Sequence, residues 1–160
     1  MKFGVISARR AGTAIVLAAL LVALTLLLQF TGAYAVFTGG TVRKLPVYIK
    51  KIDAAGHEIG THSATHSQMS KLSESEIRKE LQTSSQAIES VTGKKVELFR
   101  APFGDYDDLL VETAQSMGLY TIQWDVDSLD WKNLTASEIT LRIAGKVQPG
   151  SIILCHNNGL

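Results

Sequence analysis

A helix followed by a strand recurs four times between residues 46 and 155, and this alternation restricts the fold more than any other feature of the sequence. The helices are marked by capping residues and by apolar residues three or four positions apart. The strands are short runs of apolar residues, expected at 58–61, 96–99, 119–124 and 151–155. This alternation predicts an α/β domain in which helices cover a parallel sheet.

Reactive side chains follow each of these expected strands. His62 and His66 follow the first, Arg100 follows the second, the acidic stretch 125–130 follows the third, and His156 follows the fourth. The carboxyl ends of parallel strands meet at one edge, where α/β proteins build their sites. We therefore expect these four segments to share one rim.

His62 and His66 are candidate metal ligands. Residues four apart lie on the same face of a helical turn, and imidazole is the commonest protein ligand for zinc and its neighbours. The alternative is a pair of polar loop residues among serines and threonines. His57 and Glu58 do not complete a zinc-protease motif, because three residues instead of two separate Glu58 from His62. A catalytic zinc normally takes three protein ligands, so the pair needs a third.

The stretch 11–31 is apolar and is long enough to span a bilayer, which takes about 20 residues. Three basic residues precede it, at positions 2, 9 and 10, which favours a cytoplasmic segment 1–10 and an exported remainder. We therefore expect a single-pass anchor in the cell membrane, with the domain outside the cytoplasm.

A secreted form is the alternative to this anchor. Ala33-Tyr34-Ala35 resembles a signal-peptidase site, and cleavage after Ala35 would release the domain. The apolar run is longer than a signal peptide requires, which favours the anchor. In either case we expect residues 32–45 to be a linker and residues 46–160 to form the domain.

The charge of the chain argues against nucleic acid as a partner. The formal net charge is +1, and no basic run suggests a phosphate-binding surface. The single Cys155 excludes an internal disulfide.

Four segments resemble, in order and spacing, successive motifs of the polysaccharide deacetylases of carbohydrate esterase family 4, which carry the NodB homology domain. The segments are residues 56–66, 100–104, 127–131 and 153–156. The resemblance implies a distorted (β/α) barrel and an N-acetylated polysaccharide substrate, such as peptidoglycan or a chitin-like glycan. An apolar segment followed by this domain is also similar in layout to sporulation-associated, membrane-anchored deacetylases.

The resemblance implies a role for each matching residue. His62 and His66 would hold a divalent metal, most often zinc. His156 would be the general acid, tuned by Asp130, and the backbone N–H of Phe103 would stabilise the oxyanion. The remaining matches are Arg100, which would orient a catalytic aspartate, and Pro102 and Trp131, which would wall the acetyl pocket.

The resemblance also implies an Asp-Asp motif upstream of His62 that supplies the catalytic base and the third metal ligand. Only Asp53 and Glu58 lie between the apolar segment and His62, and neither matches this motif. We expect the lost segment at about Tyr48–Ile49, and hence an incomplete barrel. The sequence therefore predicts an impaired metal-dependent N-deacetylase; the alternatives are a non-catalytic envelope module that binds glycan and a truncated remnant.

Overall fold

The structure is a computed structural model that describes residues 34–156. The expected cytoplasmic segment 1–10 and the expected membrane segment 11–31 lie outside the described residues. Within the described part of the chain, no helix combines the length and the apolarity that crossing a bilayer requires.

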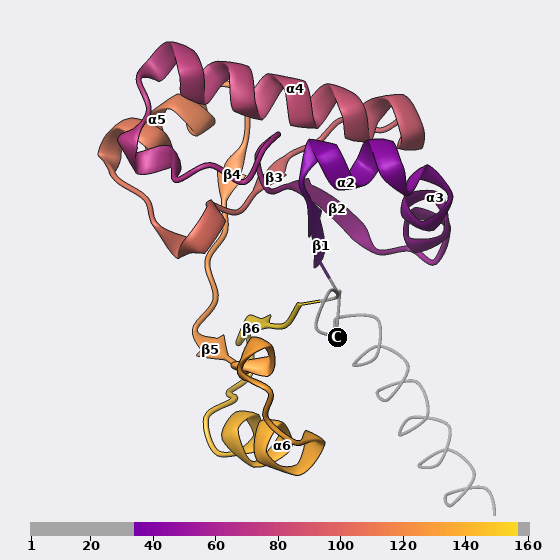
Figure 1. Cartoon of the computed structure of the whole chain (residues 1–160), viewed down its shortest axis with the longest axis vertical. Helices are drawn as coiled ribbons and strands as arrows, with labels where there is room; N and C mark the ends of the chain where they lie inside the picture. Colours follow the sequence, from indigo (N-terminus) through magenta and orange to yellow (C-terminus); the bar gives the residue numbers. More distant parts are fainter. Residues whose placement is uncertain (1–33, 157–160) are drawn as a thin grey trace, which may run out of the picture. The chain divides into compact units, whose positions relative to one another are not determined.

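The larger sheet has four strands in the order β1-β2-β3-β4 (Figure 1). The strands are β1 (Tyr34–Phe37), β2 (Glu58–Thr61), β3 (Leu98–Phe99) and β4 (Tyr120–Thr121). β3 is parallel to both of its neighbours, with Phe99 in register with Thr61 on β2 and with Thr121 on β4. The predicted parallel sheet is therefore confirmed, although β4 ends three residues earlier than we expected.

The helices beside this sheet share one buried core. They are α2 (Gly39–Lys44), α3 (Pro46–Ala54), α4 (Glu74–Thr92) and α5 (Asp108–Ser116), and α4 lies alongside the other three (Figure 1). α4 begins at the predicted capping box of Ser73 and Glu76 and ends at Gly93, which adopts the left-handed conformation. Its buried Ile77, Leu81 and Ile88 belong to the same core as Phe99 of β3. Burial of this apolar stripe against the sheet is what stabilises α4.

Residues 34–44 are not the linker that the sequence predicts. They form β1 and α2, and both Phe37 and Val42 are buried in the core. Thr38 caps α2 by accepting a hydrogen bond from the backbone N–H of Thr41. A four-residue strand and a six-residue helix carry little periodic signal, so only their packing reveals them.

The expected position of the lost segment falls within α3, and a loss at that position stays a prediction. α3 continues without interruption through Tyr48 and Ile49, and Ile49 is fully buried. The domain is therefore continuous from β1 through α3 into β2.

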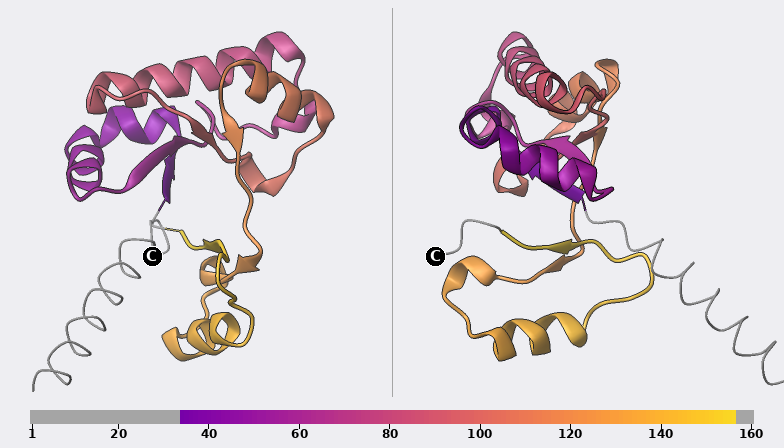
Figure 2. Two further views of the ribbon diagram at one scale, coloured as in Figure 1. Left: turned by 180° about the vertical axis from the view of Figure 1, so that it is seen from behind. Right: turned by 90° about the vertical axis from the view of Figure 1, so that its right-hand side faces the viewer.

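A second, two-stranded sheet follows. β5 (Val126–Asp127) and β6 (Ile153–Leu154) are parallel, and α6 (Ala136–Ala144) connects them (Figure 2). The predicted second capping box, Thr135 with Glu138, begins α6. Three of the four expected strands thus belong to the larger sheet, and the fourth, expected at 151–155, contributes β6 to the second sheet.

Candidate functional site

His62 and His66 lie together just beyond the carboxyl end of β2. Their ring centroids are 4.8 Å apart, and the rings meet edge to face. The connecting loop is not the helical turn we expected, because both Ser63 and His66 have positive φ, at 67° and 65°. The spacing correctly predicted that the rings are close, but two left-handed residues bring them together, and such backbone is strained for residues other than glycine.

Glu80 of α4 holds this loop in place. One of its carboxylate oxygens accepts hydrogen bonds from the backbone N–H groups of Ala64 and Thr65, both at 2.9 Å, and the other accepts from the Thr65 hydroxyl at 3.0 Å. The Ser63 hydroxyl accepts a further bond from the His66 N–H at 2.8 Å. Glu80 was not among the predicted site residues, because nothing in the sequence distinguishes it from the other acidic residues of α4.

The His62 ring is oriented by the segment that follows β3. Its Nδ1 lies 2.8 Å from the carbonyl oxygen of Arg100. A carbonyl can only accept, so Nδ1 carries the proton and Nε2 keeps its lone pair, as in metal-binding histidines. Burial lowers the pKa of His62 to about 4; the hydrogen bond to Arg100 opposes this shift, and the charges of His66, Arg100 and His156 add to it. His62 is therefore neutral at pH 7.

Arg100 is the most buried charged side chain of this region, with 6% of its surface exposed. Its Nε is buried and has no hydrogen-bond partner among the described residues. The guanidinium carbon lies 5.8 Å from the ring centre of Trp124, and burial lowers the pKa of Arg100. A buried cation without an anion is costly, so this side chain fits a carboxylate partner that the described residues do not supply.

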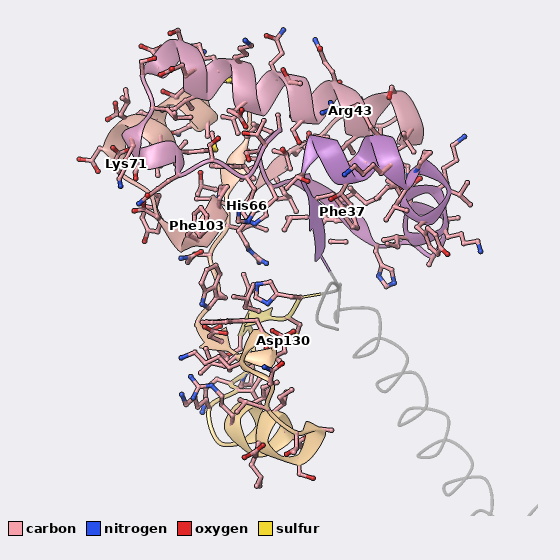
Figure 3. The ribbon with its side chains drawn as sticks, in the orientation of Figure 1. Phe37, Arg43, His66, Lys71, Phe103 and Asp130 are labelled. Atoms are coloured by element: carbon pink, nitrogen blue, oxygen red, sulfur yellow. The ribbon has the colours of Figure 1, made fainter. Side chains whose placement is uncertain are left out.

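The turn Pro102–Gly104 presents Phe103 beside the histidines. Phe103 has a φ of 63° and is 67% exposed, and its ring centroid lies 4.7 Å from that of His66 (Figure 3). Gly104 is also left-handed, and a Cβ there would lie 2.4 Å from Trp124 Cη2. Pro102 is buried at the start of the turn. Trp124 thus fills the space beside Gly104.

His156 and Asp130 form a pair that belongs to the second sheet. His156 Nδ1 lies 2.8 Å from Asp130 Oδ1, and the backbone N–H of His156 donates to the other carboxylate oxygen. Burial raises the pKa of Asp130, but hydrogen bonds from His156 and Ser128 outweigh it and lower the pKa overall. Trp131, next to Asp130, is 56% exposed.

The predicted site residues therefore gather in two groups. His62, His66, Arg100 and Phe103 meet at the larger sheet, whereas Asp130, Trp131 and His156 belong to the β5–β6 unit. No hydrogen bond or ion pair joins residues 125–156 to residues 34–124. Residues 125–156 form a separate sheet after β4, so the shared rim stays a prediction, although the charge of His156 contributes to the lowered pKa of His62.

A metal site of three protein ligands is not present in residues 34–156. No three His, Cys, Asp or Glu side chains of this range are arranged to hold an ion. His62 and His66 have suitable donor atoms, but two imidazoles leave the usual catalytic zinc set one ligand short. The donor set therefore does not fit a complete catalytic metal site.

Comparison with known proteins identifies the family. The sequence profile of the polysaccharide deacetylase family matches residues 24–122. The chain is 31% identical over 119 residues to a peptidoglycan-N-acetylglucosamine deacetylase of Bacillus cereus, covering 74% of this chain and 43% of that protein. It is 31% identical over 120 residues to a chitooligosaccharide deacetylase of Bradyrhizobium, covering 74% of this chain and 55% of that protein.

A solved structure shows the same similarity. A pseudoenzyme of carbohydrate esterase family 4 from Bacillus anthracis has a TM-score of 0.77 and 36% identity, covering 82% of this chain and 47% of its own. The chain belongs to the polysaccharide deacetylases of carbohydrate esterase family 4 and has their NodB-type α/β fold. It spans about half the length of these relatives or less.

Proposed function

We propose that this protein binds N-acetylated cell-wall glycan as a catalytically impaired polysaccharide deacetylase. The observation that carries the proposal is Arg100, a buried guanidinium without a carboxylate partner among residues 34–156. In the family, the matching arginine would orient a catalytic aspartate. All fifteen acidic residues of the chain lie between Asp53 and Glu138, inside the described part, and none pairs with Arg100.

The incomplete donor set supports the same proposal. His62 and His66 would bind a divalent metal, most often zinc, but without a third ligand they would hold it weakly. The lost general base alone is worth ~10² to 10⁴-fold in rate. The Bacillus anthracis relative is described as a pseudoenzyme, and one of its mutants as having restored enzymatic activity, so impaired members of this fold exist.

The parts that would contact a sugar support a binding role. Phe103 and Trp131 are exposed aromatic side chains in the motifs that match the family's substrate-binding segments. Aromatic rings of this kind provide flat apolar surface with little loss of conformational entropy. His156 and Asp130, which would form the general-acid pair, remain hydrogen bonded to each other. A purely glycan-binding module is thus the second candidate function.

A membrane anchor fits this function better than a secreted form does. Cleavage after Ala35 would cut β1 in the middle and leave Phe37, a core residue, as the second residue of the new chain. The proposed arrangement is a single-pass anchor at residues 11–31, with the domain facing the cell wall.

Two measurements on the purified protein test the proposal. The first is acetate release from N-acetylated chito-oligosaccharide and peptidoglycan with added zinc, for which we expect no turnover above that of the His62→Ala variant. The second is sedimentation with insoluble peptidoglycan, for which we expect binding that Trp131→Ala weakens. Tyr48→Ala removes a similarly exposed aromatic residue from α3 and serves as the control.

The outcomes separate the alternatives. Acetate release that His62→Ala abolishes would show that the enzyme is active and that impairment is wrong. Peptidoglycan binding without acetate release would support the proposal. Thermal unfolding without a cooperative transition would identify a remnant that lacks a stable fold. We expect a cooperative transition, because the domain has an extensive buried core.

A further inference from the structure

We infer that the Arg100 guanidinium is a binding site for a small carboxylate that comes from outside this chain, such as formate or acetate. This inference deepens the proposed function, because it explains what occupies the position of the absent acid. It rests on the surroundings of Arg100 and requires neither a metal nor a glycan.

Two hydrogen bonds hold the backbone of Arg100 in position. Its backbone N–H donates to the Thr61 carbonyl at 3.0 Å, and its own carbonyl accepts from His62 at 2.8 Å. Both bonds fix the residue between β2 and the histidine loop. The Trp124 ring at 5.8 Å borders the guanidinium. The backbone bonds fix where the side chain starts, and only 6% of the surface of Arg100 is exposed to water.

The chain offers this cation no anion. None of the ion pairs in residues 34–156 includes Arg100, and its Nε is buried without an acceptor. The sequence outside that range contains no Asp or Glu. No acidic side chain of residues 1–160 is therefore paired with Arg100.

The class of ligand follows from the chemistry of the guanidinium. A guanidinium presents parallel N–H donors that match the two oxygens of a carboxylate, and such charge-assisted pairs are stronger than neutral hydrogen bonds. Burial strengthens the preference, because an unpaired buried charge gains most from a counter-ion. The near-complete burial of Arg100 favours a small ligand, so formate and acetate fit better than the carboxylate of a sugar acid.

The experiment uses the metal-free full-length protein in detergent, with chelator present. Sodium formate, acetate or glucuronate replaces sodium chloride at constant ionic strength, and the melting temperature and tryptophan emission are recorded. The chain contains two tryptophans, so a Trp131→Phe background leaves Trp124, beside Arg100, as the reporter. We expect a saturable rise of about 4 °C at ten times the half-saturating concentration, with the emission of Trp124 changing at the same midpoint.

Variants decide whether Arg100 is the site. In Arg100→Met, formate and acetate should change neither the melting temperature nor the tryptophan emission. Arg100→Lys keeps the positive charge but lacks the parallel N–H donors of the guanidinium, so it should bind these carboxylates several-fold more weakly. Arg78→Met removes an exposed arginine on α4 and should keep the full response. If Arg100→Met does not fold, the comparison of wild type with Arg100→Lys still tests the site.

Three results would overturn the inference. The first is an equal rise in melting temperature with chloride, and the second is an unchanged rise in the folded Arg100→Met or Arg100→Lys protein. The third is stronger binding of glucuronate than of acetate, which would contradict the argument from ligand size. The assay contains no glycan, so loss of peptidoglycan binding would refute the proposed function and leave this result standing. Conversely, if formate and acetate do not raise the melting temperature, the inference about Arg100 is refuted and the measured binding to peptidoglycan is unaffected.

Discussion

His62 donates its Nδ1 proton to the carbonyl oxygen of Arg100 across 2.8 Å, and this bond joins the segment after β2 to the segment after β3. The bond fixes the ring and leaves Nε2 as the free donor atom. The residue that provides this orientation is also the residue with the unpaired buried charge. The loop of His62 and the segment of Arg100 are therefore held together, although no acidic side chain of residues 34–156 pairs with Arg100.

Zinc should bind weakly, through His62 and His66. We expect His62→Ala or His66→Ala to reduce the affinity by more than about 100-fold, since even loss of a residue that only orients a ligand costs 10 to 100-fold. Isothermal titration calorimetry at pH 7 measures this. His57→Ala removes an exposed histidine from the other end of β2 and should leave the affinity unchanged; an equal loss in that variant would place the zinc elsewhere.

Glu80→Ala should destabilise the protein by releasing the histidine loop. Two backbone N–H groups lose their charged acceptor, and the buried one, of Ala64, would be left unpaired at a cost of about 1–3 kcal/mol. Urea denaturation measures the free energy of unfolding. Glu74→Ala is the matched control on the same helix, because its pair with Arg78 is exposed and contributes less than about 1 kcal/mol. Equal losses in the two variants would remove the special role of Glu80.

Acid should destabilise the metal-free protein through His62. Its pKa is about 4 in the folded protein and 6.5 as the ordinary value, so the unfolded chain binds more protons between these limits. The stability that neutral His62 provides is fully present above pH 6.5 and is lost as the pH falls towards 4. Chemical denaturation from pH 7 to pH 4 should show this loss. His62→Gln should flatten the dependence, whereas His57→Gln should not.

Gly104→Ala should be more damaging than Gly93→Ala. Both glycines have positive φ, so each substitution incurs left-handed strain of about 1–2 kcal/mol. Only at Gly104 would the new Cβ also meet Trp124, at 2.4 Å, whereas no atom lies within 4 Å at Gly93. We expect at least about 1 kcal/mol of additional destabilisation at position 104. Similar melting temperatures for the two variants would show that Trp124 moves aside without cost.

The sequence predicted best what depends on local signals. The capping boxes and the following apolar stripes located the starts of α4 and α6, and Gly93 located the end of α4. The closeness of His62 and His66 also followed from their spacing, but not the loop geometry, since nothing in the sequence marks Ser63 and His66 as left-handed.

What the sequence could not provide depends on distant contacts. β1 is a four-residue strand whose role becomes visible only when Phe37 packs in the core. β4 ends early, where Gln123 and Trp124 turn to contact Gly104. The role of Glu80 also depends on a contact that the sequence does not indicate, because its hydrogen-bond partner Thr65 lies fifteen positions earlier in the chain.

The bonds from Glu80 have a consequence for local opening of the molecule. The amides of Ala64 and Thr65 belong to an irregular loop, yet their acceptor is carried by a helix anchored through Ile77 and Leu81. In hydrogen–deuterium exchange they should therefore be protected as long as the amides in the middle of α4, and not exchange rapidly like those of an ordinary surface loop. The loop that presents the histidines would then open only in the rare event that detaches its neighbouring helix.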